Sequence, residues 1–153
     1  MIDGVMPPID VVDEAVVDSP AMVVFNAVLN EHNGTTHWWM PYWESKLRAR
    51  ALDHEGVVFD ITVHGRHTPR FSARITRIEE GKLIEMENEG DFAGTGTWTF
   101  EPADGKTKVR FRWNVKPKRL SFVLVSPFVD MGKIHSDVMQ KGFKALKSFL
   151  GQK

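Results

Sequence analysis

Residues 127–150 read PFVDMGKIHSDVMQKGFKALKSFL, and their apolar side chains fall on one side of a helix. At about 100° per residue, one face carries Phe128, Met131, His135, Val138, Met139, Gly142, Phe143, Leu146, Phe149 and Leu150. Ser126 and Pro127 predict the start of the helix and Gly151 predicts its end. Gly142 and His135 are unusual choices for a buried helical face. We therefore expect this helix to cover a cavity.

The composition limits the class of protein. The chain has 153 residues, a length typical of one domain, and we expect residues 1–153 to form a single domain. Its 20 basic and 20 acidic residues balance, which disfavours binding to nucleic acid or to an anionic membrane surface. The lack of cysteine excludes disulfides and thiolate chemistry. No apolar run approaches the roughly 18 residues of a membrane span, and residues 1–8 do not resemble a secretion signal, so we expect a cytoplasmic protein.

Upstream of this helix, alternating apolar and polar residues predict strands. A first strand at 9–18 is expected to run into a short helix at 20–29. The tryptophan-rich segment 35–43 is expected to hold a second brief helical turn that Pro41 ends. Short turns typical of antiparallel hairpins join the further strands, at 43–50, 57–64, 70–79, 83–89, 92–101 and 108–115. Residues 116–126, with the apolar run 122–125, are expected to form a loop with some helical turn that connects the last strand to the terminal helix.

This order predicts an α+β domain with one highly curved antiparallel sheet and two short helices after the first strand. Four segments add to the pattern: DSPA at 18–21, WWMP at 38–41, DGKTKV at 104–109 and MQKGFKALK at 139–147. Together they make the chain resemble the START-like helix-grip superfamily, also called SRPBCC, and within it the polyketide cyclase/dehydrase-type proteins. The resemblance implies a seven-stranded sheet wrapped around the C-terminal helix, with an apolar ligand cavity between them. Such a fold hosts many functions, so the function has to be inferred from the residues of the site.

The apolar faces of the predicted strands and helix are expected to enclose this cavity. Gly94, Gly96 and Gly142 are small where a filled core prefers bulk, which favours a cavity over a solid core. Its predicted walls are large apolar side chains, namely Phe71, Ile84, Met86, Trp98, Phe100, Phe111, Trp113, Met139 and Phe143. The alternative is that the same residues form an ordinary core.

Two polar residues face the predicted cavity. His135 can orient a ligand carbonyl or hydroxyl, or act as a catalytic acid or base, because an unperturbed imidazole titrates near pH 6.5. Asn88 can supply one hydrogen-bond donor and one acceptor to a ligand. The alternatives are that His135 finds a hydrogen-bond partner inside an ordinary core and that Asn88 lies at the end of its strand.

The remaining histidines do not predict a metal site. His64 and His67 lack a third ligand nearby. His32 and His37 lie in a polar segment, where exposure to solvent is expected. No phosphate loop, dinucleotide fingerprint or nucleophile elbow is present, and we expect no cofactor.

The tryptophan-rich segment has two interpretations. Trp38, Trp39 and Trp43 either form a lid at the mouth of the cavity or fill the gap between the short helices and the sheet. We expect one or two of them to be buried as filling.

Three functions fit these expectations. The first is binding of a hydrophobic small molecule, such as a lipid, isoprenoid, quinone or polyketide-like compound. The second is a polyketide cyclase/dehydrase-type enzyme that uses the same cavity, and the third is a protein-interaction module. The shortage of acid and base groups facing the cavity, with Tyr42 the only phenol, favours binding over catalysis. We expect a monomer or a weak homodimer.

Overall fold

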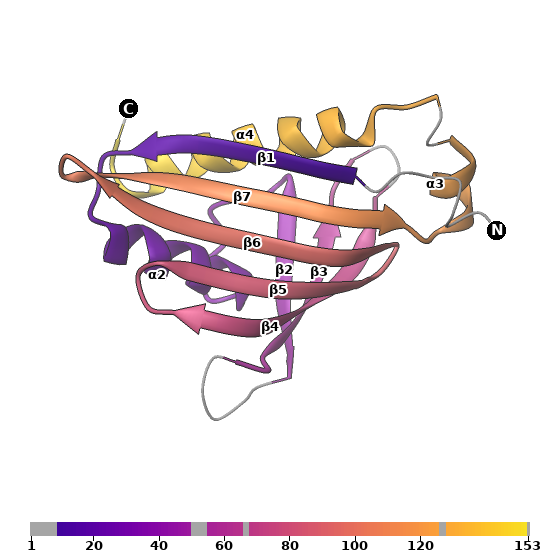
Figure 1. Ribbon diagram of the computed structural model, residues 1–153, viewed down its shortest axis with the longest axis horizontal. Coiled ribbons are helices and arrows are strands. Elements are labelled where there is room, and N and C mark those ends of the chain that lie inside the picture. Colours follow the sequence, from indigo (N-terminus) through magenta and orange to yellow (C-terminus); the bar gives the residue numbers. More distant parts are fainter. Residues whose placement is uncertain (1–8, 50–54, 66–67, 126–127, 153) are drawn as a thin grey trace.

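The fold is a curved antiparallel sheet with a long helix along its concave face (Figure 1). The computed structural model describes residues 9–49, 55–65, 68–125 and 128–152. The strands are β1 (Ile9–Val17), β2 (Trp43–Ala49), β3 (Val58–Val63), β4 (Arg70–Glu79), β5 (Leu83–Gly90), β6 (Phe92–Ala103) and β7 (Lys106–Pro117). The helices are α2 (Ala21–His32), α3 (Leu120–Val125) and α4 (Met131–Phe149). The predicted α+β helix-grip class is therefore confirmed.

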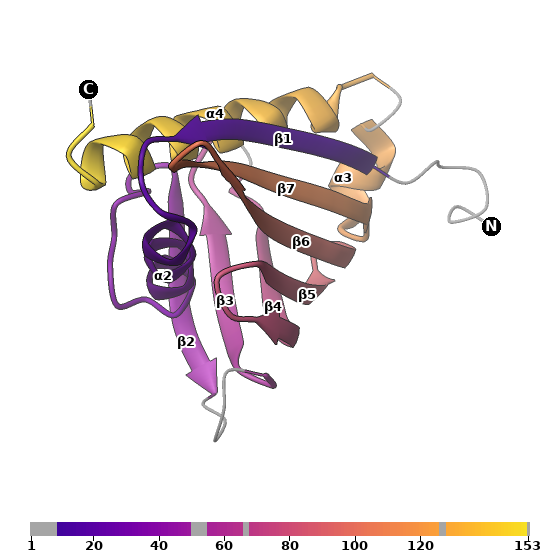
Figure 2. The ribbon, with the colours of Figure 1, turned by 60° about the vertical axis from the view of Figure 1, so that its left-hand side comes forward.

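The seven strands lie in the order β1-β7-β6-β5-β4-β3-β2, and every neighbouring pair is antiparallel. Figure 2 shows how strongly the sheet curves from β1 round to β2. In both views α2 and α3 lie at opposite ends of the sheet, while α4 runs along β1. The concave face is thus covered by α4 along its length and bounded by one short helix at each end.

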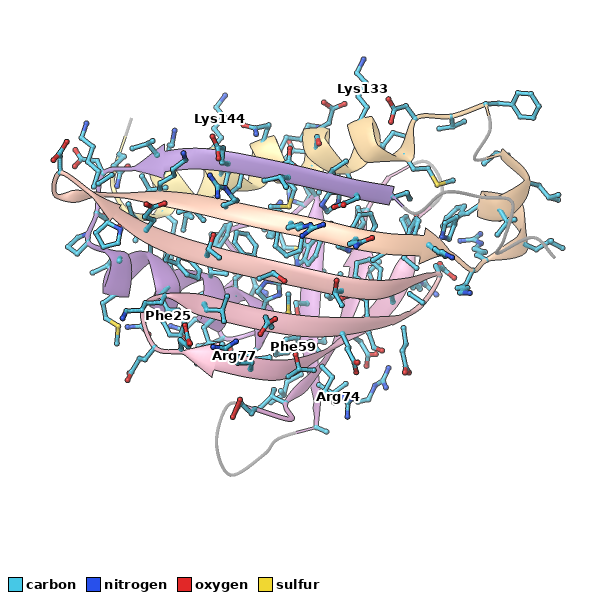
Figure 3. All side chains as sticks on the ribbon, viewed as in Figure 1. Phe25, Phe59, Arg74, Arg77, Lys133 and Lys144 are labelled. Carbon is cyan, nitrogen blue, oxygen red and sulfur yellow. The ribbon has the colours of Figure 1, made fainter. Side chains whose placement is uncertain are left out.

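Strand β7 illustrates why these sequences form a two-faced sheet. Val109, Phe111 and Trp113 are buried, whereas Arg110 and Arg112 point outward and pair with acidic residues of β1. This alternation places apolar side chains under α4 and charged side chains in water. Figure 3 shows the same outward direction for Arg74 and Arg77 on β4, which pair with glutamates of β5.

Helix α4 begins later than the sequence predicts. Its first residue is Met131, and the side chain of Asp130 caps it by accepting a hydrogen bond of 2.9 Å from the backbone N–H of Lys133. The predicted cap Ser126 and the predicted first-turn Pro127 lie outside the described residues. The predicted end is confirmed, because Gly151 adopts a left-handed φ of 82° directly after the helix and its N–H donates to the carbonyl of Ser148.

The second short helix is not where the sequence predicts it. Between α2 and β2, residues 38–42 form hydrogen-bonded turns rather than a helix. The structure has α3 between β7 and α4, in the segment expected to be a connecting loop with some helical turn. Its short apolar run Phe122, Val123, Leu124 and Val125 is compatible with a helix of roughly one and a half turns. Among the described residues, no helix is long and apolar enough to cross a bilayer.

Candidate ligand-binding cavity

A cavity of about 320 Å³ lies between the first half of α4 and the concave face of the sheet. Its volume is at the lower end of the range for small-molecule sites, roughly 300–1,000 Å³. Apolar side chains supply most of its surface. The lining residues are Val63, His64, Gly65, Pro69, Phe71, Phe92, Trp113, Phe122, Val125, Val129, Met131, Ile134, His135 and Val138.

Aromatic rings form the wall on the sheet side. The ring of Phe92 lies 5.0 Å from that of Trp113, 5.4 Å from that of Phe122 and 6.2 Å from that of Phe71. The Phe92 and Phe71 rings meet edge to face, and the Phe92 and Phe122 rings stack, both of which are favourable aromatic arrangements. These contacts fix the wall because each ring is held by another ring from a different element. A rigid apolar wall is suited to a flat or compact hydrophobic guest.

The histidine of α4 also belongs to this wall. The His135 imidazole stacks on the indole of Trp113, with 4.1 Å between the centroids. Its side chain is buried, and Nε2 finds no hydrogen-bond partner among the described residues. Burial lowers the pKa of His135 to about 3, because a charged ring would lose its hydration there. The ring is therefore neutral at physiological pH.

The structure brings together three of the predicted site residues at this cavity. Phe71, Trp113 and His135 line it. The other predicted residues do not line it and are buried in the packed interior, namely Ile84, Met86, Asn88, Trp98, Phe100, Phe111, Met139 and Phe143. Asn88 is the polar member of this second group, and its Oδ1 has no hydrogen-bond partner in the described part of the chain. The cavity is therefore displaced along α4 toward the start of the helix.

The expected cause of the cavity is wrong. A Cβ atom built at Gly142 would overlap the indole ring of Trp39, so this glycine allows close packing instead of leaving space. Likewise, a Cβ atom at Gly96 would lie 2.9 Å from the ring of Phe111. At Gly94, where φ is 151°, the backbone of β7 occupies the corresponding position. All three glycines mark places where another part of the chain approaches closely.

Two of the three tryptophans fill the interior, as expected. Trp39 and Trp43 are buried and stack with 4.4 Å between ring centroids, and Trp39 Nε1 donates to the carbonyl of Val138 in α4. Trp38 is only partly buried and stacks on the outer side of Trp39. The tryptophan-rich segment therefore closes the second half of the space between α4 and the sheet.

A buried carboxylate at the end of α2 holds this segment in place. Glu31 accepts hydrogen bonds from the backbone N–H groups of Trp38 and Trp39, at 3.0 and 2.8 Å, and from the hydroxyl of Thr36 at 2.8 Å. A buried charge is tolerable when several donors satisfy it. Glu31 thus determines where the tryptophan backbone lies.

The expectation that His32 is solvated is wrong. His32 is buried at the end of α2, its Nε2 accepts a hydrogen bond of 2.9 Å from Trp98 Nε1, and burial lowers its pKa to about 4. The sequence does indicate that His32 is buried, because Val24, Val28 and His32 are spaced four residues apart on one helical face. His37 is exposed, as expected.

Sequence reasoning misses most of the cavity walls. It places Phe92 on the apolar face of its strand but not in the site, and it interprets the apolar run around Phe122 as part of a connecting loop with some helical turn, not as part of the site. Both Phe92 and Phe122 can be recognised in the sequence as apolar residues. The sequence does not show that α3 folds back over the end of β7, which brings Phe122 and Val125 to the cavity.

The chemistry of this cavity is dominated by apolar contact. The lining residues with polar side chains are His64, near the turn after β3, and His135. Among the described residues, no group of three or more His, Asp or Glu side chains is arranged to hold a metal ion. His67, which the sequence pairs with His64, lies outside the described residues. The arrangement can exclude water and hold a hydrophobic molecule.

Comparisons with known proteins agree with this architecture. Residues 8–151 match the family described as polyketide cyclase / dehydrase and lipid transport. A START superfamily protein from Mycobacterium smegmatis is similar in structure, with 17% identity, a TM-score of 0.71 and coverage of 91% of this chain and 94% of that one. A protein from Thermus thermophilus has 15% identity, a TM-score of 0.70 and coverage of 91% and 94%.

A third similar structure is the di-domain ARO/CYC protein StfQ from the steffimycin biosynthetic pathway. It has 14% identity and a TM-score of 0.70, with coverage of 94% of this chain and 50% of that one. No curated protein matches the sequence. At these identities the solved structures show the shared fold alone.

Proposed function

Because the chain belongs to the polyketide cyclase/dehydrase and lipid transport family, we propose that it binds a hydrophobic small molecule in the cavity beneath the first half of α4. The observation that carries the proposal is the apolar cavity of about 320 Å³ with its wall of aromatic rings. Burying an apolar ligand against such a wall gains about 25 cal/mol for each Å² removed from water. A lipid-like, isoprenoid, quinone or polyketide-like molecule of compact size fits this description.

Catalysis of the cyclase or dehydrase kind is less well supported by the residues present. An efficient general acid or base has a pKa near the working pH. Burial lowers the pKa of His135 to about 3, so its neutral ring has no proton to give as an imidazolium acid and is a weak base. Tyr42 does not line the cavity, and its ring lies 4.7 Å from the Lys141 ammonium on the surface. Binding is therefore the function that these groups favour.

A fluorescence titration tests the proposal. The probe is N-phenylnaphthylamine, an uncharged compound of compact size whose emission rises in apolar surroundings. We expect saturable binding to the wild type and an affinity lower by about tenfold or more in Val138→Phe, because the larger side chain fills the cavity. Val12→Phe is the matched control, because Val12 is exposed on β1 and is not part of the cavity.

Two further outcomes decide the interpretation. Native mass spectrometry of the purified wild type should show a retained small molecule or a complex with the added probe at one-to-one stoichiometry. Equal probe affinity in the wild type and in folded Val138→Phe would contradict the assignment of the cavity as the binding site.

A further inference from the structure

His135 differs from the other buried polar side chains of the protein. Of those that the described residues contain, it alone lines the cavity. It is only 8% exposed, yet its Nε2 has no hydrogen-bond partner in the described part of the chain. A buried polar atom that is left unpaired lowers the stability of a protein. The position of this imidazole therefore requires a physical explanation.

His32 is a useful comparison because it is also buried. Its Nε2 accepts a hydrogen bond of 2.9 Å from Trp98 Nε1, so a polar partner orients that ring. The His135 ring is held by stacking instead, with its centroid 4.1 Å from that of Trp113 and 5.8 Å from that of Phe111. Stacking fixes the plane of the imidazole, but it pairs neither nitrogen, because both nitrogens form their hydrogen bonds in the plane of the ring.

The direction of the His135 nitrogens is less restricted than the plane of the ring. A half-turn about the Cβ–Cγ bond exchanges nitrogen and carbon positions but keeps the outline of the ring, and rotation about this bond has a roughly two-fold profile. Stacking on Trp113 is preserved in both orientations. Because the ring borders the cavity, it can therefore turn a nitrogen toward a molecule that enters.

The other lining residue with a polar side chain, His64, has a different environment. Its side chain is 42% exposed, and its Nε2 lies 3.8 Å from a carboxylate oxygen of Glu44. Water already solvates such a group, so a hydrogen bond from a ligand would replace one from water and add little affinity. At His135 a ligand would instead supply a partner that the unliganded protein lacks.

We propose that the ligand is an apolar molecule that carries a hydroxyl group, and that His135 binds this hydroxyl inside the cavity. This inference rests on the binding function proposed above and names the class of ligand. Burial lowers the pKa of His135 to about 3, so the ring is neutral and has one donor and one acceptor nitrogen. A hydroxyl both donates and accepts, so it matches either nitrogen. A carbonyl matches only the donor, and a hydrocarbon matches neither.

Two probes that differ in one group test the role of His135. They are a naphthol and the methylnaphthalene substituted at the same position, whose hydroxyl and methyl groups are similar in size. Displacement of N-phenylnaphthylamine gives the dissociation constant of each probe for the wild type and for His135→Phe, which retains a ring to stack on Trp113 but has no polar atom. We call the ratio of the methylnaphthalene constant to the naphthol constant the hydroxyl preference. It should be about tenfold higher in the wild type, because the variant loses one buried hydrogen bond.

Two further variants make the comparison specific. Asn88→Leu is the matched control, because Asn88 is also buried with an unpartnered Oδ1 in the described part of the chain but does not line the cavity. This variant should keep the wild-type hydroxyl preference. His135→Leu introduces a smaller side chain than His135→Phe, and it should lose the preference as well, so the test does not depend on whether the phenyl ring fits.

Other outcomes would overturn the proposal. An equal hydroxyl preference in the wild type and in the folded His135 variants, with both probes bound, would exclude His135 as the hydroxyl site but leave the cavity as the binding site. An equal loss of preference in Asn88→Leu would show that the effect does not come from the cavity wall. Failure of N-phenylnaphthylamine and both probes to bind the wild type would contradict the proposed binding function, and the hydroxyl assignment with it.

Discussion

The two halves of α4 meet the same sheet in different ways. In the second half, residues 139–149, Met139, Phe143 and Leu146 are buried and Trp39 packs directly on Gly142. In the first half, residues 131–138, the helix faces the cavity, and Ile134 is exposed at its edge. One amphipathic helix therefore covers a solid core at one end and a cavity at the other.

The difference shows what creates space in this fold. Glycine does not create it, because Gly142 of α4 lies in the packed half, where it admits an indole ring. The cavity occurs instead where short side chains surround a ring of aromatics, since Val63, Val125, Val129 and Val138 all line it. Branched side chains of this length do not reach across to the opposite wall. A filled interior needs longer side chains at these positions.

Lowering the pH should have the largest effect on the free energy of unfolding. Burial lowers the pKa of His32 in the packed half to about 4 and that of His135 at the cavity to about 3, from 6.5 in an exposed chain. Below about pH 6.5 the unfolded chain takes up protons that the folded chain does not, so the stability from each group is lost as the pH falls toward its folded pKa. Each should contribute a loss on the order of 3–5 kcal/mol.

Urea unfolding at a series of pH values measures this loss. His32→Gln keeps a hydrogen-bond acceptor for Trp98 Nε1 but cannot titrate, so the stability of this variant should fall less steeply between about pH 6.5 and about pH 4 than that of the wild type. Parallel pH profiles for the two proteins would show that His32 titrates normally.

Removing the indole of the packed half should have the next largest effect. Trp39→Ala deletes a fully buried side chain that stacks on Trp43, and we expect a loss of about 3–5 kcal/mol in the free energy of unfolding. Phe122→Ala at the cavity should cost clearly less, because part of its ring faces empty space and makes no packing contacts there. Urea unfolding of both variants checks the contrast, and equal losses would mean that the two halves are packed alike.

Substituting Gly142 of α4 by alanine should have the smallest of the three effects on stability. Gly142→Ala improves the helix propensity, yet its Cβ would overlap the indole of Trp39. We expect a net loss of about 1–3 kcal/mol, as for overpacked cores. Ser148→Ala, at an exposed position of the same helix, is the control for helix propensity alone. A stabilised Gly142→Ala variant, measured by thermal unfolding, would instead place open space beside this glycine.

Most of the fold could be predicted from the sequence because strands and helices are local patterns. The alternation in β4 and β7 and the 3.6-residue period of α4 each fix an element without knowledge of its neighbours. The start of α4 is ambiguous in the sequence because Ser126 with Pro127 and Asp130 both resemble helix starts. Some helical turn could be expected in the segment that holds α3, but its bounds could not, because six residues are too few to show a helical period.

The site was harder to predict because it depends on residues far apart in the chain. Gly142 is compatible with either a gap or a close approach, and only the position of Trp39 decides between them. Phe71, Trp113 and His135 could be placed in the site because each lies on an apolar face that is visible in the sequence. Phe122 and Val125 join them only through the folding of α3 over the sheet.

The packed half depends on Glu31, a buried residue of α2 that does not line the cavity. Its carboxylate accepts hydrogen bonds from the backbone of Trp38 and Trp39, and Trp39 packs on Gly142 in the half of α4 that carries no cavity-lining residue. In the binding function that we propose, this anchored loop would therefore limit how far a ligand extends along α4, while the aromatic wall would limit its shape. Within this architecture, the size of ligand that the cavity accepts and its preference for ligand shape can change independently of each other.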